Sequence, residues 1–227
     1  MIDKRYEIKF VVPNYFVNNM DALINQSMKG FNEIYNPREV SSIYLDTPNF
    51  KFANQNLQGF AYRKKFRLRF YNQQKSDVRF EIKSKSGQIC FKDIYEIKNS
   101  IDFIFSNLNN LKQELFAFNS LLNYQIHQLN PVLLCTYKRK YFSSDCKRFR
   151  LTLDSNISFG RITPIINYYE AQKNLIKLGN SVLELKCNIK DISSTNDLLQ
   201  EFPLRVLKHS KYEIGLLKTS SLDPKFF

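Results

Sequence analysis

Residues 60–71 read FAYRKKFRLRFY, a stretch in which basic and apolar residues alternate. An extended chain places every second side chain on the same face. One face of this stretch therefore carries Lys65, Arg67 and Arg69, whereas the aromatic and aliphatic side chains between them fall on the other face. This period of two predicts a β-strand with one cationic face and one apolar face.

Strand-like alternation recurs through most of the chain. It predicts strands at 5–12, 38–47, 60–71, 78–85, 88–98, 131–142, 147–157 and 181–188, and a short additional strand near 158–163 also fits. Apolar residues at helical spacing predict helices at 14–28, 108–128 and 194–202, with a shorter helix that starts at Thr47 and Pro48. Because the strands come in clusters instead of alternating with helices, we expect an antiparallel α+β fold.

The composition is that of a basic globular protein. The 227 residues suit one domain, and 43% of them are apolar. Lys and Arg number 34 against 21 acidic residues, which gives a formal net charge of +13. Such a surplus indicates a polyanionic partner, which could be nucleic acid, an anionic membrane surface or a phosphate chain. A solvated basic surface without such a partner is the plainer alternative.

Several kinds of site are excluded by what the sequence lacks. The six glycines form neither GxxxxGK(S/T) nor GxGxxG, so any bound phosphates must be held by side chains. Four isolated cysteines and two histidines provide no spacing typical of a zinc site. The longest apolar runs are too short to span a bilayer, and the N-terminus has no apolar signal-peptide core, so we expect a cytoplasmic protein.

The cationic faces allow two arrangements. In one, an ordinary sheet turns its basic face to solvent; in the other, the sheet closes into a barrel with the basic face inside and helices on the apolar outside. The second arrangement has an electrostatic cost, because two like charges about 5 Å apart repel by about 3 kcal/mol at an effective dielectric of about 20. Glu7, Glu81 and Glu184 would offset part of this repulsion, and a bound polyanion the rest. The alternation alone leaves both arrangements open.

Eight short motifs follow one another along the chain. They are RYEIKF at 5–10, IYLDT at 43–47, RKKFRLRFY at 63–71, FEIK at 80–83, YKRKY at 137–141, RLTLD at 150–154, LELK at 183–186 and KHSKY at 208–212. In this order they resemble the vacuolar transporter chaperone (VTC) domain, a branch of the triphosphate tunnel metalloenzymes, or CYTH-like superfamily. The KxSKY ending is the most discriminating of these motifs.

The resemblance implies a fold and a set of site residues. The fold would be a closed antiparallel β-barrel with helices packed outside, a single tunnel domain over residues 1–227. Phosphate oxygens would be bound by Lys9, Arg67, Arg69, Lys83, Lys92, Tyr137, Arg139, Arg150, Lys208, Ser210 and Lys211. The catalytic set would be Lys9, Arg67, Arg69, Lys83, Arg139, Arg150, Glu184 and Lys211. Glu184 matches the position that holds a divalent metal, Mn²⁺ or Mg²⁺, in this family.

The implied activity is that of an ATP-dependent polyphosphate polymerase, which transfers the ATP γ-phosphate to a growing polyphosphate chain. Hydrolytic relatives begin with E-x-E-x-K, but the first of these positions is Arg5 here, which leaves Glu7 and Lys9 and favours a polymerase over a triphosphatase. A second departure is KDI at 92–94, where relatives more often have K-x-R. A non-catalytic binding module for polyphosphate or inositol polyphosphate is the alternative from another class. Nucleic-acid binding is not expected, because no motif supports it.

The remaining expectations concern neighbours of the implied site. Glu7 and Glu81 could either neutralise nearby lysines or, in a hydrolase, help to orient water, and Asp46 is expected to cap the helix that follows it. Lys64 and Lys140 are expected to be solvated on the opposite face. In eukaryotic relatives the domain is attached to membrane segments, so a separate membrane partner at the inner face of the membrane is a hypothesis. The sequence does not indicate an oligomeric state.

Overall fold

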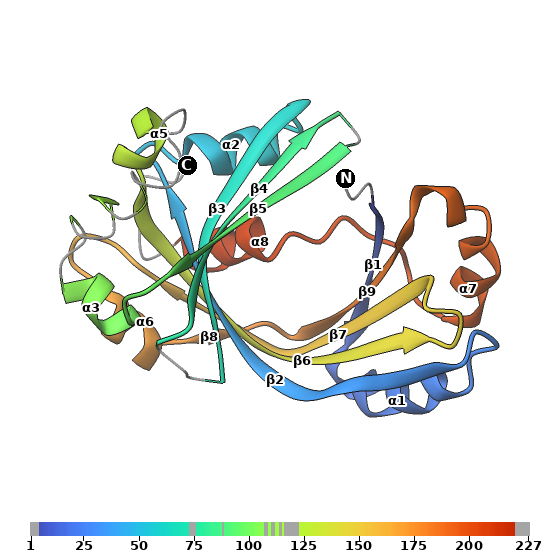
Figure 1. Cartoon of the computed structure of the whole chain (residues 1–227). Helices are drawn as coiled ribbons and strands as arrows, with labels where there is room; N and C mark the ends of the chain where they lie inside the picture. Colours follow the sequence, from blue (N-terminus) through green and yellow to red (C-terminus); the bar gives the residue numbers. More distant parts are fainter. Residues whose placement is uncertain are drawn as a thin grey trace. The chain divides into compact units, whose positions relative to one another are not determined.

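The computed structural model describes residues 5–72, 76–87, 89–106, 109, 112–113, 115 and 123–220. Its strands in chain order (Figure 1) are β1 (Arg5–Pro13), β2 (Phe31–Asp46), β3 (Tyr62–Tyr71), β4 (Val78–Ser86), β5 (Ile89–Ile97), β6 (Asn130–Ser144), β7 (Phe149–Arg161), β8 (Ile176–Lys177) and β9 (Asn180–Asn188). Its helices are η1 (Asn14–Phe16), α1 (Val17–Asn25), α2 (Lys51–Leu57), α3 (Ile101–Ser106), α5 (Asn123–His127), α6 (Tyr168–Lys173), η3 (Ile189–Asp191), α7 (Thr195–Glu201) and α8 (Lys211–Lys218).

Hydrogen bonds join the strands into a large sheet with the order β1-β9-β7-β6-β2-β3-β4-β5, and β8 pairs with β7. The ladders β1–β9, β9–β7, β2–β3, β3–β4 and β4–β5 are antiparallel. The expected α+β fold with a large antiparallel sheet is therefore confirmed. Within the described ranges no ladder joins β1 to β5, so the closed barrel stays a prediction.

The chain divides into two compact units. Unit 1 comprises Met1–Glu39, Tyr137–Ile157 and Lys177–Ser210. Unit 2 comprises Val40–Thr136, Ser158–Ile176 and Lys211–Phe227. Each unit has its own apolar core and its own charged sheet face, so each can be understood from its own residues.

The core of unit 1 lies between the sheet and two helices. Alternate residues of β1, β7 and β9 pack there against α1 and α7. The buried members of this cluster are Ile8, Phe10, Val12, Met20, Ile24, Phe31, Phe142, Phe149, Leu151, Leu153, Leu183, Leu185, Cys187, Leu198 and Phe202. Phe10 of β1 contacts Phe202 just after α7, with ring centroids 5.9 Å apart. Helices therefore cover the apolar face, and the charged residues in between lie on the other face.

The core of unit 2 is built in the same way with other helices. Apolar residues of β2, β3 and β4 pack against α2, α3, α5 and α6. The buried members are Ile43, Leu45, Phe52, Phe66, Leu68, Phe70, Val78, Phe80, Ile82, Ile97, Ile101, Ile104, Leu115, Ile126, Leu129, Leu134, Ile162, Tyr168 and Ala171. Phe52 of α2 meets Phe66 of β3 edge to face, with ring centroids 4.8 Å apart. The basic residues of β3 alternate with these core positions, so the two faces predicted for residues 60–71 are confirmed.

Strand β2 differs most from its prediction, because it begins at Phe31 and the expected strand began at residue 38. Residues 32–37 are all exposed. Apolar and polar side chains alternate in a strand when one face is buried. Because neither face is buried here, the period of two is absent. Pairing with a neighbouring strand, not local patterning, decides this part of β2.

The helices agree with prediction where the apolar period is long enough to detect. Helices α3, α6 and α8 were not predicted, and each has eight residues or fewer. The predicted helix at 108–128 is matched near its end by α5, and most of its other residues lie outside the described ones. In the described part of the chain, no helix combines the length and the apolar character that a membrane crossing requires.

The expectation that Lys64 is solvated is wrong. Its side chain is buried, and Nζ donates a hydrogen bond to Oε1 of Gln125 in α5 at 3.0 Å. A lysine stem can lie along an apolar face while its ammonium group reaches a polar partner. Lys140 remains part-exposed, but its Nζ lies 2.5 Å from Oδ2 of Asp21 in α1, so it too has a specific partner.

Gly160 in β7 approaches α6 so closely that a side chain has no room. A Cβ at this position would overlap the backbone carbonyl of Ala171. We expect Gly160→Ala to destabilise the protein by about 2–3 kcal/mol, because overpacking against backbone strains both elements. Gly179→Ala is the matched control, since nothing lies within 4 Å of a Cβ there, and it should cost less than about 0.5 kcal/mol. Urea-induced unfolding measures both, and equal midpoints would contradict the close approach.

Candidate functional site

Charged side chains of unit 1 lie on the sheet face opposite the helices. The register pairs Lys9 with Glu184 and Glu7 with Lys186 across β1 and β9. On the other side of β9, Lys186 faces Arg150 of β7. Residues paired directly in an antiparallel ladder lie on the same face. Three strands thus contribute cations and carboxylates to one surface, which we call the unit 1 face.

Arg139 of β6 is held by carboxylates. Its Nε and Nη2 donate to Oδ1 and Oδ2 of Asp154 at 2.5 and 2.7 Å, and Nη2 lies 3.9 Å from Oε2 of Glu184. Burial alone would lower the pKa of Arg139, but Asp154, with Tyr137 and further groups, raises that pKa well above its usual value. The guanidinium lies over the Tyr137 ring, 5.2 Å from its centroid. Arg139 is therefore both charged and fixed in orientation.

Glu184 is a buried carboxylate of the unit 1 face. Its side chain is 7% exposed, and Oε1 lies 3.2 Å from Nζ of Lys186. Burial raises the pKa of a carboxyl group, but the Lys186 ammonium and a hydrogen bond with Glu7, together with two further cations, hold the pKa of Glu184 well below its usual value. Glu7 in turn lies 2.9 Å from Nζ of Lys9, which confirms that it neutralises a lysine. Glu184 is thus ionised at neutral pH, with a second carboxyl group beside it.

The segment that follows α7 runs alongside β1 at Lys9. Nζ of Lys9 donates to the backbone oxygen of His209 at 3.1 Å. The backbone N–H of Leu207 donates to the backbone oxygen of Lys9 at 3.0 Å. These contacts place the backbone of the predicted ligands Lys208 and Ser210 next to the unit 1 face.

Glu81 of β4 is a buried carboxylate on the charged sheet face of unit 2. Its side chain is 2% exposed, and it receives Nε of Arg67 at 2.6 Å and Nζ of Lys92 at 2.7 Å. Nη1 of Arg69 lies 3.5 Å from the same carboxylate. Burial raises the pKa of Glu81, but the three cations outweigh it and lower that pKa below its usual range. The expected role of Glu81 as a neutralising partner is confirmed.

Lysines extend the charged face of unit 2, which we call the unit 2 face. The register pairs Lys83 with Lys65 of β3 on one side and with Lys92 of β5 on the other. Nζ of Lys65 lies 2.9 Å from Oε1 of Glu213 in α8. Burial lowers the pKa of Lys92 to about 8, although the Glu81 carboxylate acts in the opposite direction. Three lysines in one row leave this face with a surplus of positive charge.

A buried carboxylate at the end of β2 fixes the start of α8. Asp46 accepts hydrogen bonds from the backbone N–H groups of Phe52 and Ala53 at 3.0 and 2.8 Å, which confirms its predicted capping role for α2. Its Oδ2 also accepts a hydrogen bond from the hydroxyl of Tyr212. Because Lys211 precedes Tyr212 directly, this contact fixes the backbone of the predicted ligand Lys211.

Each unit thus brings together part of the predicted set. The unit 1 face carries Lys9, Arg139, Arg150 and Glu184. The unit 2 face carries Arg67, Arg69, Lys83 and Lys92. Tyr137, Lys208, Ser210 and Lys211 are placed by the contacts of their neighbours. The roles of all these residues as phosphate ligands stay predictions.

Two residues of the unit 1 face were not among the predicted site residues, although the alternation along their strands places them on that face. Asp154 holds Arg139, and Lys186 pairs with Glu184. A signal for both was present, since Asp154 lies four positions after Arg150 and Lys186 lies two positions after Glu184. Charged residues in phase with a predicted ligand on one strand must share its face.

The carboxylates of unit 1 fit a divalent metal that also binds substrate. Glu7 and Glu184 lie within hydrogen-bonding reach of each other, with the Lys9 and Lys186 ammonium groups beside them. Among the described residues, no group of three or more His, Cys, Asp or Glu side chains is arranged to hold a metal. Mg²⁺ commonly binds through one or two carboxylates and completes its shell with water and substrate phosphates. Glu184 and Glu7 therefore suit Mg²⁺ or Mn²⁺ bound together with phosphate oxygens.

A family model described as the VTC domain matches residues 4–220, which includes both charged faces. The chain belongs to the VTC domain family. The resemblance found in the eight ordered motifs is therefore confirmed. None of the curated proteins compared with this VTC domain matches it in sequence.

Solved structures with low sequence identity share the fold of this VTC domain. A candidate adenylate cyclase from Vibrio parahaemolyticus is 16% identical, with a TM-score of 0.55 and coverage of 94% of this chain and 98% of that chain. A candidate adenylate cyclase from Bacillus halodurans is 12% identical, with a TM-score of 0.56 and coverage of 92% and 94%. A protein from Pyrococcus horikoshii OT3 is 14% identical, with a TM-score of 0.52 and coverage of 94% and 99%. At these identities the likeness concerns the fold alone.

The lowered pKa of Lys92 predicts that triphosphate affinity depends on pH. The unfolded chain keeps this proton up to about pH 10.5, whereas the folded protein loses it at about 8, so Lys92 makes the free energy of unfolding rise with pH between these values. The folded protein loses this ammonium charge as the pH rises through about 8, and triphosphate binding should weaken by about tenfold. Lys92→Arg should remove this loss, because a guanidinium stays charged.

Calorimetric titration with inorganic triphosphate from about pH 7 to about pH 9.5 measures this effect. Lys138→Arg changes an exposed lysine in unit 1 and serves as the control, which should follow the wild type. Triphosphate itself changes protonation over this pH range, and comparing the variants cancels that contribution because it is the same for each protein. The same pH dependence in the wild type and in Lys92→Arg would contradict the assignment of Lys92.

The hydrogen bond from Tyr212 to Asp46 should matter for stability, because both groups are buried. We expect Tyr212→Phe to lower the free energy of unfolding by about 2 kcal/mol, since a buried carboxylate loses a donor. Tyr169→Phe is the matched control, because the Tyr169 hydroxyl donates to Asp102 at an exposed position. It should cost less than about 0.5 kcal/mol in the same urea titration. A larger loss in Tyr169→Phe than in Tyr212→Phe would contradict the anchoring role.

Proposed function

We propose that this VTC domain is an ATP-dependent polyphosphate polymerase that transfers the γ-phosphate of ATP to a growing polyphosphate chain in a basic tunnel. Membership of the VTC family makes phosphoryl chemistry on a polyphosphate plausible. The observation that carries the proposal is that the charged face of each unit presents cations around an ionised, buried carboxylate, Glu184 in unit 1 and Glu81 in unit 2. The family match extends across both units, which supports one functional domain over the chain.

The paired carboxylates suit a polymerase because they fix the cations before substrate binds. Asp154 holds Arg139 through two hydrogen bonds, and Glu81 holds Arg67. In phosphoryl transfer the protein mainly positions the reactants and places cations around the transferred group. Cations that are already oriented need no reorganisation as charge moves during the reaction. The guanidinium forks would contact phosphate oxygens, and the more mobile lysines would follow the chain.

The proposed reaction forms one bond and breaks one bond. A terminal oxygen of the polyphosphate chain attacks the γ-phosphorus of ATP, and the bond from this phosphorus to the β–γ bridging oxygen breaks. The electron pair leaves with ADP, and the chain gains one phosphate unit. Because the attacking oxygen is already an anion, no general base is required.

The residues would divide this work between binding and charge stabilisation. Those proposed to bind phosphate are Lys9, Arg67, Arg69, Lys83, Lys92, Tyr137, Arg139, Arg150, Lys208, Ser210 and Lys211. Glu184, with Glu7 beside it, would hold Mg²⁺ or Mn²⁺. The metal would supply a further positive charge next to the phosphate oxygens.

Glu7 supports a second candidate, an inorganic or nucleoside triphosphatase of the same fold. A hydrolase must orient a water molecule, and a carboxylate beside the metal position could do so. Against this reading, the first carboxylate of the hydrolytic E-x-E-x-K pattern is replaced by Arg5. One acidic metal position is thereby lost, so we favour the polymerase.

Glu184→Gln tests the proposed function with little change in shape. The purified wild type, given ATP with Mn²⁺ or Mg²⁺, should produce ADP and long phosphate chains, resolved by gel electrophoresis and chromatography. Glu184→Gln should lower this rate by at least about 100-fold, because the carboxylate that holds the metal is lost. Glu170→Gln is the matched control, since the exposed Glu170 side chain pairs with Lys173 on the surface and this variant should keep full activity.

The products distinguish the alternatives. ADP and orthophosphate without chains would make the protein a triphosphatase. No turnover, with tight polyphosphate binding by the wild type and by Glu184→Gln alike, would contradict the catalytic proposal and leave a binding module.

A further inference from the structure

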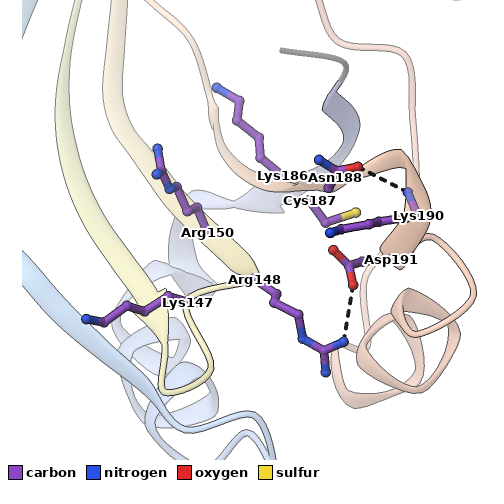
Figure 2. A pocket seen from close by; sticks show the side chains of 8 residues that line it. All are labelled: Lys147, Arg148, Arg150, Lys186, Cys187, Asn188, Lys190 and Asp191. Carbon is purple, nitrogen blue, oxygen red and sulfur yellow. Dashed lines mark hydrogen bonds and ion pairs between the residues drawn. The ribbon is translucent and has the colours of Figure 1, made fainter. Parts of the chain in front are cut away.

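Unit 1 contains a basic cleft that extends beyond the residues assigned above. The cleft has a volume of about 260 Å³ and is formed by the start of β7, the end of β9 and the turn η3 (Figure 2). It is lined by Lys147, Arg148, Arg150, Lys186, Cys187, Asn188, Lys190 and Asp191. Only Arg150 among these belongs to the predicted phosphate ligands.

Positive charge dominates the cleft. Five of the lining residues are basic and one is acidic. The acidic residue, Asp191, forms an ion pair with Arg148, whose Nη1 lies 3.2 Å from Oδ1 of Asp191. Within the part of the chain that the structure describes, no ion pair is formed by Lys147, Arg150 or Lys190. The cleft is therefore a place where a multiply charged anion would relieve repulsion.

The backbone that carries these cations is held in place. Lys147 has a left-handed backbone conformation, with φ of 56°, and its N–H donates to the Ser144 oxygen at 2.8 Å. The N–H of Lys190 donates to Oδ1 of Asn188 at 3.2 Å, which caps η3. In Figure 2 the side chains of Arg150 and Lys186 extend in the same direction from their strands. The charges therefore come from a defined surface, not from a free tail.

The cleft is continuous with the unit 1 face. Arg150 and Lys186 are partners in the β7–β9 ladder, and the next pair on the same face is Thr152 with Glu184. Two residues along a strand span about 7 Å. A chain bound near Glu184 could thus continue over Arg150 and Lys186 towards Lys147 and Lys190 without leaving a cationic surface.

The lining favours bare phosphate over nucleotides or nucleic acid. No aromatic side chain lines the cleft. The neighbouring Phe149 is fully buried in the apolar core and offers no ring face to a ligand. Binding of single-stranded nucleic acid gains much of its energy from bases that stack on aromatic rings. Lysine and arginine groups alone recognise phosphate oxygens.

We propose that this cleft binds a run of phosphate units of polyphosphate beyond the transfer site, so that unit 1 holds the chain over a longer span than the transferred group requires. The identity of the polymer rests on the proposed function. The consequence is a preference for long chains over triphosphate that depends on Lys147, Arg148 and Lys190.

The double variant Lys147→Asn/Lys190→Gln tests the cleft with little risk to folding. Both lysines are exposed, and asparagine tolerates the left-handed conformation at position 147. Lys138→Gln/Lys177→Gln is the matched control, because it removes the same charge from two exposed positions of unit 1 outside the cleft. Thermal unfolding checks that all three proteins fold alike.

The measurement is equilibrium binding of long-chain inorganic polyphosphate and of inorganic triphosphate at several salt concentrations. The cleft variant should bind the long chain about fivefold more weakly, with triphosphate affinity within about twofold of the wild type. The slope of the logarithm of the long-chain binding constant against the logarithm of the salt concentration should become shallower by roughly one to two, because two cations no longer displace counterions. The control variant should change neither ligand by more than about twofold.

Three results would overturn the cleft proposal. They are equal losses for both ligands, equal losses in the cleft and control variants, or equally strong competition by a single-stranded oligonucleotide of the same charge. Because binding is measured without turnover, the two proposals fail separately. A protein that makes chains but shows no selective loss keeps its proposed function and loses the cleft. If the protein makes no chains but the cleft variant selectively loses affinity for the long chain, the cleft proposal stands and the proposed function does not.

Discussion

An ionised carboxylate buried among cations is the interaction on which the charged face of each unit depends. Glu81 binds Arg67 and Lys92 directly, and Glu184 lies beside Lys186 and Arg139. Without such a carboxylate, cations on neighbouring strands would repel at a distance where water screens them poorly. Removing one partner of a buried ion pair leaves an uncompensated charge, which is strongly unfavourable. The carboxylates thus make a dense basic face compatible with folding.

The same alternation that builds these faces also builds the cores. Each strand sends one set of side chains towards helices, where Phe66 of unit 2 and Phe149 of unit 1 are almost fully buried. Burial of one such aromatic side chain contributes about 1.5–3 kcal/mol. Because the helices occupy the apolar side, the charged side is left for ligands. A substitution that shifted a strand by one residue would exchange the faces and lose both core and site.

The basic cleft continues the charged surface of the β7–β9 ladder into the adjacent turns, which gives a surface suited to a polymer. Arg150 lies at the start of β7 and Lys186 near the end of β9, so both are close to turns of the chain. The turn residues Lys147 and Lys190 continue the positive charge on backbone that hydrogen bonds hold in place. A ligand made of identical anionic units suits such a surface, because it can be bound at any point along its length.

The sequence by itself determined most of the strands, their two faces, the α+β class and the VTC family, because a period of two and short ordered motifs are local properties of the chain. Tertiary structure decided what depends on contacts between distant residues. It placed Asp154 against Arg139, buried Lys64 beneath Gln125 of α5 and extended β2 back to Phe31. The physical reason is register: which residues meet across a ladder or beneath a helix is set by the packing of whole elements, and no local pattern records it.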